Sequence, residues 1–183
     1  MAFWKTGVDI RQKHQFKLEF VSEDGEPFFD SDIIWYAKSV SRPTAELNTT
    51  EYQIGNHKFT YPGVVVWSDV EIVLTDVVDL SGFGTTTRKM LEMLKGYGYT
   101  TPNESEAAVF GKLQSGRKLG QILIHSFITE EEDAQELLPM HTTWTLHNPY
   151  PKTINFGQLD YSSEEEVEIA ITFAYDYATL LEF

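Results

Sequence analysis

Alternation of apolar and polar residues at every second position is the feature that most restricts the fold of this chain. Successive side chains of an extended strand point to opposite faces, so this period marks strands with one buried face. It recurs at 14–21, 68–75, 119–128 and, most clearly, 167–177, and 32–40 and the short, Thr-rich 142–146 are further strand candidates. The pattern predicts a mainly β chain in which 167–177 forms one long strand.

One segment follows the helical period instead. Residues 88–95 place Met90, Leu91 and Leu94 on one face, with threonines before them to cap the start and Gly96 to end the helix. A further helical turn is predicted within 129–138, which opens with the spacing of a capping box. The predicted fold class is therefore an antiparallel β-sandwich or barrel with one flanking α-helix.

Length and composition fit a single globular domain. The chain has 183 residues, of which 42% are apolar and 23% charged, an ordinary composition for a protein with a packed core. No fixed-period repeat or convincing Pro/Gly/Ser linker divides it, so one domain is expected over 1–183. Residues 1–13 are predicted to form an N-terminal arm and 100–116 a long loop.

The net charge excludes some partners. There are 28 acidic and 14 basic residues, for a net charge of −14. Residues 1–100 hold 10 basic and 14 acidic residues (net −4), and 101–183 hold 4 and 14 (net −10). Such a surface repels phosphate, which disfavours tight binding to nucleic acid or to an anionic membrane. The absence of cysteine, of a signal-like start and of a long apolar run predicts a soluble protein made in a reducing compartment.

A hairpin is predicted at 50–61. Gly55-Asn56 is a two-residue turn signal, and it would pair Tyr52 with Phe59 and Gln53 with Lys58. One face then holds Tyr52, Ile54, Phe59 and Tyr61, and the other holds Glu51, Gln53, Lys58 and Thr60. An isolated ribbon with an apolar face and two free edges is marginal in water. It is either an ordinary hairpin of a sheet in the same chain or one that joins neighbouring subunits into a larger closed barrel.

The search for catalytic or metal-binding residues gives no specific motif. The chain has no Gly-x-Ser-x-Gly elbow, phosphate loop or His-Glu-x-x-His helix. Each weaker pattern has an ordinary structural explanation, and we expect neither an enzyme nor a cofactor. Among the scattered histidines 14, 57, 125, 141 and 147, the last two could form a metal pair, and the acidic clusters 130–133 and 164–166 could bind calcium. Asp176 or Glu168 could be half of a glycosidase pair. The turn 116–118 could hold an anion.

A different class of function is also open. A β-sandwich could bind carbohydrate through exposed tryptophans, and the chain has four candidates, Trp4, Trp35, Trp67 and Trp144. Most of them lie in strand patterns that indicate burial, which disfavours this alternative.

The C-terminal third carries a succession of short motifs. A strand pattern with Trp144 leads into the aromatic–proline turn 148–151, then into Leu159-Asp160-Tyr161, and finally into a strand that ends in Asp176-Tyr177. This succession resembles the end of the major tail tube proteins of contractile-tailed bacteriophages. The hairpin, the strand from Trp67 and the helix follow the same order, so the resemblance spans about residues 15–177.

The resemblance implies a structural virion protein of a phage tail, assembled in the host cytoplasm. Six subunits would form a ring whose hairpins join into one closed β-barrel, and stacked rings would form the hollow inner tube that delivers the genome. The implied partners are further copies, the sheath, baseplate and tape-measure proteins, and genomic DNA in transit without tight binding, with no membrane. A tube initiator or terminator, or the tube of a bacteriocin or injection system, fits equally well.

The acidic charge has a mechanical explanation in such a tube. Carboxylates on the wall would repel phosphate within a screening length of ~8 Å and keep DNA from adhering. Residues on the polar faces of strands are the candidates for the lumen, namely Glu51, Gln53, Glu168 and Asp176. Solvation of an outer surface explains the same residues.

Overall fold

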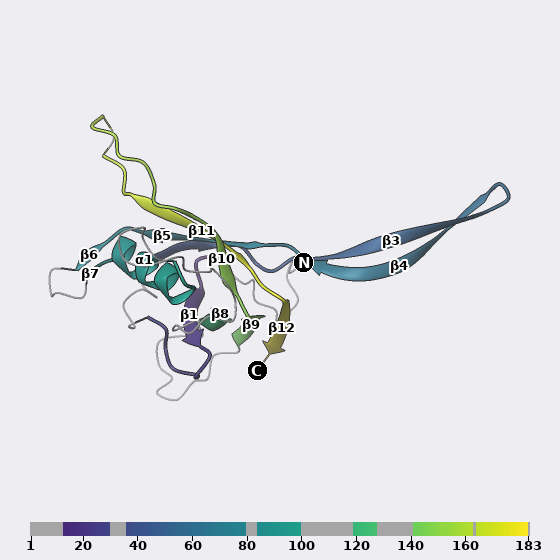
Figure 1. Ribbon diagram of the computed structural model, residues 1–183, viewed down its shortest axis with the longest axis horizontal. Coiled ribbons are helices and arrows are strands. Elements are labelled where there is room, and N and C mark those ends of the chain that lie inside the picture. Colours follow the sequence, from purple (N-terminus) through teal and green to yellow (C-terminus); the bar gives the residue numbers. More distant parts are fainter. Residues whose placement is uncertain are drawn as a thin grey trace, which may run out of the picture.

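A computed structural model describes residues 13–29, 36–79, 84–99, 119–127, 141–162 and 164–182 of the chain (Figure 1). Residues 1–12 of the predicted arm, the 100–116 loop and the helical turn within 129–138 lie outside these ranges. So do Trp4, Trp35, the acidic cluster 130–133 and the basic turn 116–118.

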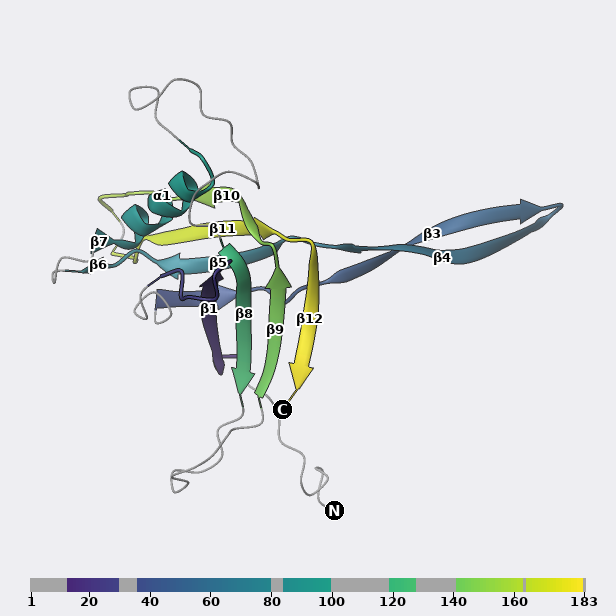
Figure 2. The same cartoon turned by 60° about the horizontal axis from the view of Figure 1, so that its bottom comes forward.

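Two four-stranded antiparallel sheets form the body of the molecule (Figure 2). The first has the order β1 (Phe16–Ser22), β8 (Leu119–Phe127), β9 (His141–His147), β12 (Tyr177–Glu182). The second has the order β10 (Tyr150–Asn155), β11 (Glu168–Ala174), β5 (Val70–Thr75), β2 (Ala37–Val40). The remaining strands form two ribbons, β3 (Ala45–Ile54) with β4 (His57–Trp67), and β6 (Val78–Asp79) with β7 (Gly84–Thr85). The prediction of a mainly β, antiparallel chain is confirmed.

The core lies between the two sheets, on the strand faces that the alternation marks. Leu18 and Ile122 of the first sheet, and Ile72, Leu74 and Ile169 of the second, are fully buried. The rings of Phe20 and Phe173 meet across the core with centroids 6.2 Å apart. Each such side chain contributes roughly 1.5–3 kcal/mol by leaving water, so the alternating segments stabilise the two sheets against each other.

The helix α1 (Thr86–Gly96) flanks these sheets and confirms the predicted one. Thr85 is its N-cap and accepts a hydrogen bond from the backbone N of Arg88 at 3.1 Å. Met90 and Met93 are fully buried, whereas Leu91 is 39% exposed, so the buried face is rotated from the predicted one. The C-cap, Tyr97, donates a hydrogen bond from its hydroxyl to the carbonyl oxygen of Pro149 at 2.6 Å, which fixes the helix to the start of β10.

The C-terminal alternating segment is where the structure corrects the sequence prediction. The predicted single strand 167–177 is wrong, because β11 ends at Ala174 and β12 begins at Tyr177 in the other sheet. The backbone N of Asp176 bonds to the carbonyl oxygen of His147 at 3.0 Å, so the chain crosses from one sheet to the other at this corner. Apolar residues continue at every second position to Tyr177, but Tyr177 is exposed and its neighbour Ala178 packs against the core, so the inward-facing positions shift by one residue at the corner.

Candidate assembly surface

Strands β3 and β4 form a ribbon that projects well beyond the body of the molecule (Figures 1 and 2). Every residue of β3 is exposed, and so is every residue of β4 before Trp67. In the described part of the chain, the two strands pair only with each other, so the outer edge of each offers unpaired backbone groups. A long exposed strand edge is a template for pairing with another chain.

The register of this ribbon confirms the predicted hairpin. Ile54 pairs with His57, Gln53 with Lys58, Tyr52 with Phe59, Glu51 with Thr60 and Thr50 with Tyr61. Gly55 has φ +61, the left-handed conformation that a two-residue turn of this type requires. The turn chemistry alone therefore determines which residues share a face.

One face of the outer half of the ribbon is apolar. Tyr52, Ile54, Phe59 and Tyr61 expose 63%, 68%, 47% and 56% of their surface. Two of these side chains meet, since the rings of Tyr52 and Tyr61 pack edge to face with centroids 6.2 Å apart. Apolar surface at this density on a two-stranded ribbon makes this face a candidate interaction surface.

The opposite face is polar and internally paired. The Lys58 ammonium lies 3.0 Å from a carboxylate oxygen of Glu51. Gln53 donates from Nε2 to the carbonyl oxygen of Gly55 at 3.2 Å. These groups are satisfied in water without a partner, so the two faces of the ribbon suit different surroundings.

The ribbon is longer than predicted, and a bulge separates its inner and outer halves. Thr49 pairs with Pro62 and Leu47 with Val65, so Gly63 and Val64 together lie opposite Asn48. Alternation breaks at such a bulge, which is why the sequence predicts only 50–61. A Cβ on Gly63 would lie 2.8 Å from the carbonyl oxygen of Asn48, so this position requires glycine.

The base of the ribbon is anchored to the body. The backbone N of Ser68 bonds to the carbonyl oxygen of Thr44 at 2.9 Å. Trp67 packs on Tyr175 with ring centroids 6.2 Å apart. Burial is the main cause that raises the pKa of Tyr175 to about 12. The aromatic pair joins the ribbon to the corner between β11 and β12.

The four residues suggested for the lumen do not lie together. Glu51 and Gln53 share the polar face of the ribbon. Glu168 begins β11 and forms an ion pair with Lys38, and this hydrogen bond raises the pKa of the lysine. Asp176 lies at the sheet-crossing corner, where it accepts a hydrogen bond from Asn148 at 2.9 Å. The lumen role of all four stays a prediction.

The described residues form no arrangement that supports an enzyme active site or a metal site. Glu168 forms an ion pair with Lys38, and Asp176 accepts a hydrogen bond from Asn148, so each carboxylate suggested for a glycosidase pair has an ordinary structural partner. His147 stacks on Tyr177 and bonds to the Thr179 hydroxyl at 2.9 Å. Across the described ranges, no group of three or more His, Cys, Asp or Glu residues could hold a metal ion.

The remaining alternatives concern tryptophan platforms and membranes. Trp67 and Trp144 are both partly buried, Trp67 against Tyr175 and Trp144 against the core, so neither is an open platform for a sugar. The only helix in the described part of the chain, α1, is too short and too polar to cross a membrane.

Fold and surface together define a class: a β-sandwich that carries an extended hairpin with one apolar face and two edges that no other described strand pairs. No protein-family model matches the sequence, and no curated protein matches it significantly. Solved structures do match over nearly the whole chain.

Three of these structural matches come from contractile injection systems. A chain of the anti-feeding prophage baseplate matches with a TM-score of 0.61 and 16% identity, covering 95% of this chain and 97% of that chain. The tube-terminating cap of the same particle matches with a TM-score of 0.60 and 18% identity, covering 100% of both chains. A chain of the sheath–tube complex of an extracellular contractile injection system matches with a TM-score of 0.59 and 15% identity, covering 95% of this chain and 93% of that one.

The chain therefore has the fold shared by tube and cap proteins of contractile injection systems. The resemblance read from the C-terminal motifs is confirmed at the level of the fold.

Proposed function

We propose that this chain is a structural subunit that assembles into rings and that the rings stack into the hollow inner tube of a contractile tail-like particle. The observation that carries the proposal is the projecting hairpin, whose outer half exposes Tyr52, Ile54, Phe59 and Tyr61 on one face. In a ring, hairpins of neighbouring copies would pair edge to edge and close one barrel, which removes every free edge. A heterologous contact closes a ring when its rotation permits.

Rings of six are the version we propose. The baseplate that contains a similar chain has six-fold symmetry. In this arrangement the apolar face of the hairpin would be covered by neighbouring protein, and the polar face with Glu51 and Lys58 would line the lumen. A net charge of −14 would then favour a wall to which DNA does not adhere.

The partners follow from the same arrangement. Further copies of this chain, a sheath, a baseplate and a tape-measure protein would surround the tube in a particle assembled in the bacterial cytoplasm. The transported material would be the genome in a phage tail, or another cargo in an injection system. Similarity to chains of injection systems favours the second version.

A tube terminator is a second candidate, and two matches favour it. The structural match to the anti-feeding prophage cap extends over the whole of this chain. The sheath–tube terminator of the extracellular injection system matches with a TM-score of 0.56 and covers 97% of this chain. A terminator would form single rings and end a growing tube, whereas a tube subunit would stack without limit.

The test places two charges on the apolar face of the hairpin. Tyr52→Glu with Phe59→Glu should leave a folded monomer that forms no rings, because the two carboxylates would be desolvated opposite each other. The matched control is Gln53→Glu with Thr60→Lys on the polar face, where each new charge lies opposite an existing one of opposite sign, Lys58 or Glu51.

Negative-stain microscopy and sedimentation velocity supply the readout. Wild type and control should form rings or tubes, and circular dichroism should show that all three proteins are folded. Long tubes indicate the main subunit and single rings indicate the terminator. Normal assembly by the Tyr52→Glu/Phe59→Glu variant would show that the hairpin is not the assembly surface.

A further inference from the structure

The loop that joins β10 to β11 projects from the body at the end opposite the hairpin (Figures 1 and 2). In its described residues, 156–162 and 164–167, Leu159 is 84% exposed and Tyr161 is fully exposed. These two side chains therefore gain almost no burial in their own subunit. The sequence from 156 to 167 contains four acidic residues and no basic one, namely Asp160, Glu164, Glu165 and Glu166.

Local hydrogen bonds hold this loop in shape. Gly157 has φ +81 and bonds through its N to Oδ1 of Asn155 at 3.1 Å. Oδ1 of Asp160 accepts from both the N and the hydroxyl of Ser162, at 2.9 and 2.8 Å. Leu159 and Tyr161 are thus presented by a preformed turn, which lowers the entropy that binding must overcome.

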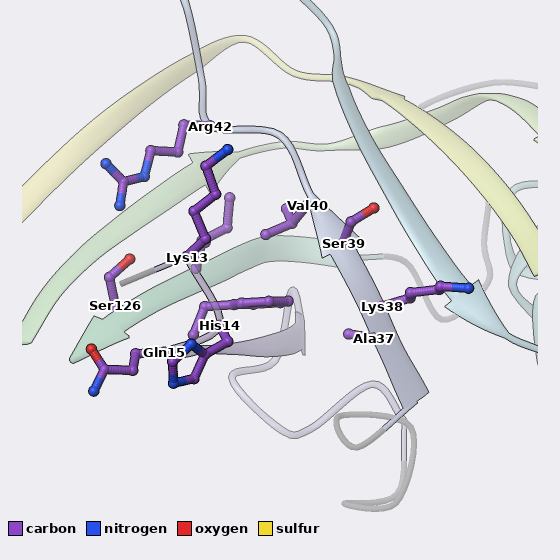
Figure 3. Close-up of a pocket in the computed structure, with 11 residues that line it drawn as sticks. Lys13, His14, Gln15, Ala37, Lys38, Ser39, Val40, Arg42 and Ser126 are labelled. Atoms are coloured by element: carbon purple, nitrogen blue, oxygen red, sulfur yellow. The ribbon is translucent and has the colours of Figure 1, made fainter. Parts of the chain in front are cut away.

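A surface with the opposite properties lies on the same chain. A depression of about 880 Å³ opens between the edge strands β1 and β2 of the two sheets (Figure 3). Its apolar part is formed by Phe16, Ala37, Val40 and Ile124, and none of its eleven lining residues is acidic. In a chain with twice as many acidic as basic residues, this local excess of positive charge is a complementary site for an acidic segment.

Two cations at this depression are available to a partner. Lys13 and Arg42 both line it (Figure 3), and neither forms an ion pair with a carboxylate in the described part of the chain. Lys38 also contributes to the lining, but it extends away from the other two (Figure 3) and pairs with Glu168. Lys13 and Arg42 are therefore the cations with charge to offer.

The loop meets β11 beside one end of the depression, where Lys38 pairs with Glu168, and Arg42 lies at the other end. Glu168, where the loop ends, pairs with Thr75 at the end of β5. Val40 pairs with Ile72, and the backbone N of Ser41 bonds to the carbonyl oxygen of Glu71. Arg42, the following residue, therefore lies toward the start of β5. Leu159 and Tyr161 are exposed in their own subunit and do not line the depression, so a contact that buries them there would join two copies head to tail.

We propose that the β10–β11 loop of one copy inserts Leu159 and Tyr161 into the depression between β1 and β2 of the next copy, with the loop carboxylates facing Lys13 and Arg42. This contact rests on the proposed self-assembly and is distinct from the hairpin contact. It makes each subunit both donor and receptor, in addition to the pairing of hairpins.

Cross-linking tests the contact directly, because the chain contains no cysteine. The variant Tyr161→Cys with Ser39→Cys carries one thiol on the loop and one in the depression. A short bismaleimide should convert it into a ladder of covalent oligomers, while each single variant stops at a dimer. The matched control, Tyr161→Cys with Arg88→Cys on the exposed side of α1, should give no ladder beyond the dimer.

A charge swap tests the chemistry of recognition. Arg42→Glu alone, or Glu164→Lys with Glu166→Lys alone, should raise the critical concentration for assembly about tenfold, which is about 1.4 kcal/mol. All three changes in one chain should restore assembly to nearly the wild-type level. Thermal unfolding of the monomers should be unchanged, since these exposed side chains are not part of the core.

The outcomes separate this contact from the proposed function. Tubes that form in every variant without a ladder would overturn the loop contact and leave the tube assignment intact. If the wild type stays monomeric, the tube assignment fails, and the double-cysteine variant at high concentration still decides whether loop and depression meet.

Discussion

The same chemical deletion at two isoleucines should separate assembly from folding. Ile54 lies near the hairpin turn and is 68% exposed, whereas Ile171 lies in β11 and is 1% exposed. Ile→Ala removes three carbons, worth about 2.4 kcal/mol if the side chain is completely buried at ~0.8 kcal/mol per carbon. The two substitutions thus remove equal apolar volume from a surface that awaits a partner and from a finished core.

The expected magnitudes follow from these exposures. For Ile54→Ala about two-thirds of the 2.4 kcal/mol, or about 1.6 kcal/mol, should be lost from the subunit interface, a factor of about 15 in association. The isolated subunit should lose less than about 1 kcal/mol. For Ile171→Ala the fold should lose about 2–5 kcal/mol because a cavity remains in the core, which lowers Tm by roughly 4–20 °C in a chain of this size.

Two measurements on each protein complete the experiment. Calorimetry on dilute, monomeric samples gives Tm, and sedimentation velocity across a concentration series gives the critical concentration for assembly. Ile54→Ala should change the second and hardly the first. Equal losses of Tm in both variants, with no change in the assembly of Ile54→Ala, would show that the hairpin face is buried within the subunit and refute the reasoning.

Three further substitutions probe single features of the fold. Gly157→Ala should lower the free energy of unfolding by about 1–3 kcal/mol, because its Cβ would lie 2.6 Å from the carbonyl oxygen of Glu168. The control Gly25→Ala has a similar positive φ but open space around it, so it should lose less. Equal losses of the two variants in denaturant titrations would argue against the clash. Thr85→Ala should lose about 1 kcal/mol in the same assay through the lost helix cap, and Thr85→Ser should retain the stability. Burial raises the pKa of Tyr175 from 10.0 to about 12, so folding favours the neutral phenol and the free energy of unfolding should fall as pH rises from 10 toward 12. Tyr175→Phe should lack this part of the pH dependence. An alkaline stability profile that is the same in Tyr175→Phe and wild type would contradict the prediction.

Much of the secondary structure was predictable because its signals are local. The alternation at 68–75 places Val70, Ile72 and Leu74 on the face that the structure buries. The Gly55-Asn56 turn determines the register of the outer hairpin, and the capping threonine determines where the helix begins. Each of these signals depends on residues within a few positions of each other, so the sequence displays them directly.

The failures occur where local signals are interrupted or ambiguous. Pro151 and the register shift after it hide strand β10 from a search for alternation. The bulge at Gly63 and Val64 hides the inner half of the hairpin. The corner at Asp176 is hidden for the opposite reason, because the alternation runs through it without a break.

The sequence by itself determined the apolar and polar faces of the strands and of the hairpin, since side-chain alternation is a property of any extended backbone. The tertiary structure decided which strands share a sheet, that none of the described residues covers the apolar face of the hairpin, and that an acidic loop and a basic depression form on the same subunit. Those outcomes depend on contacts between segments far apart in the chain. Their free energies come from packing, and no local pattern of residues records them.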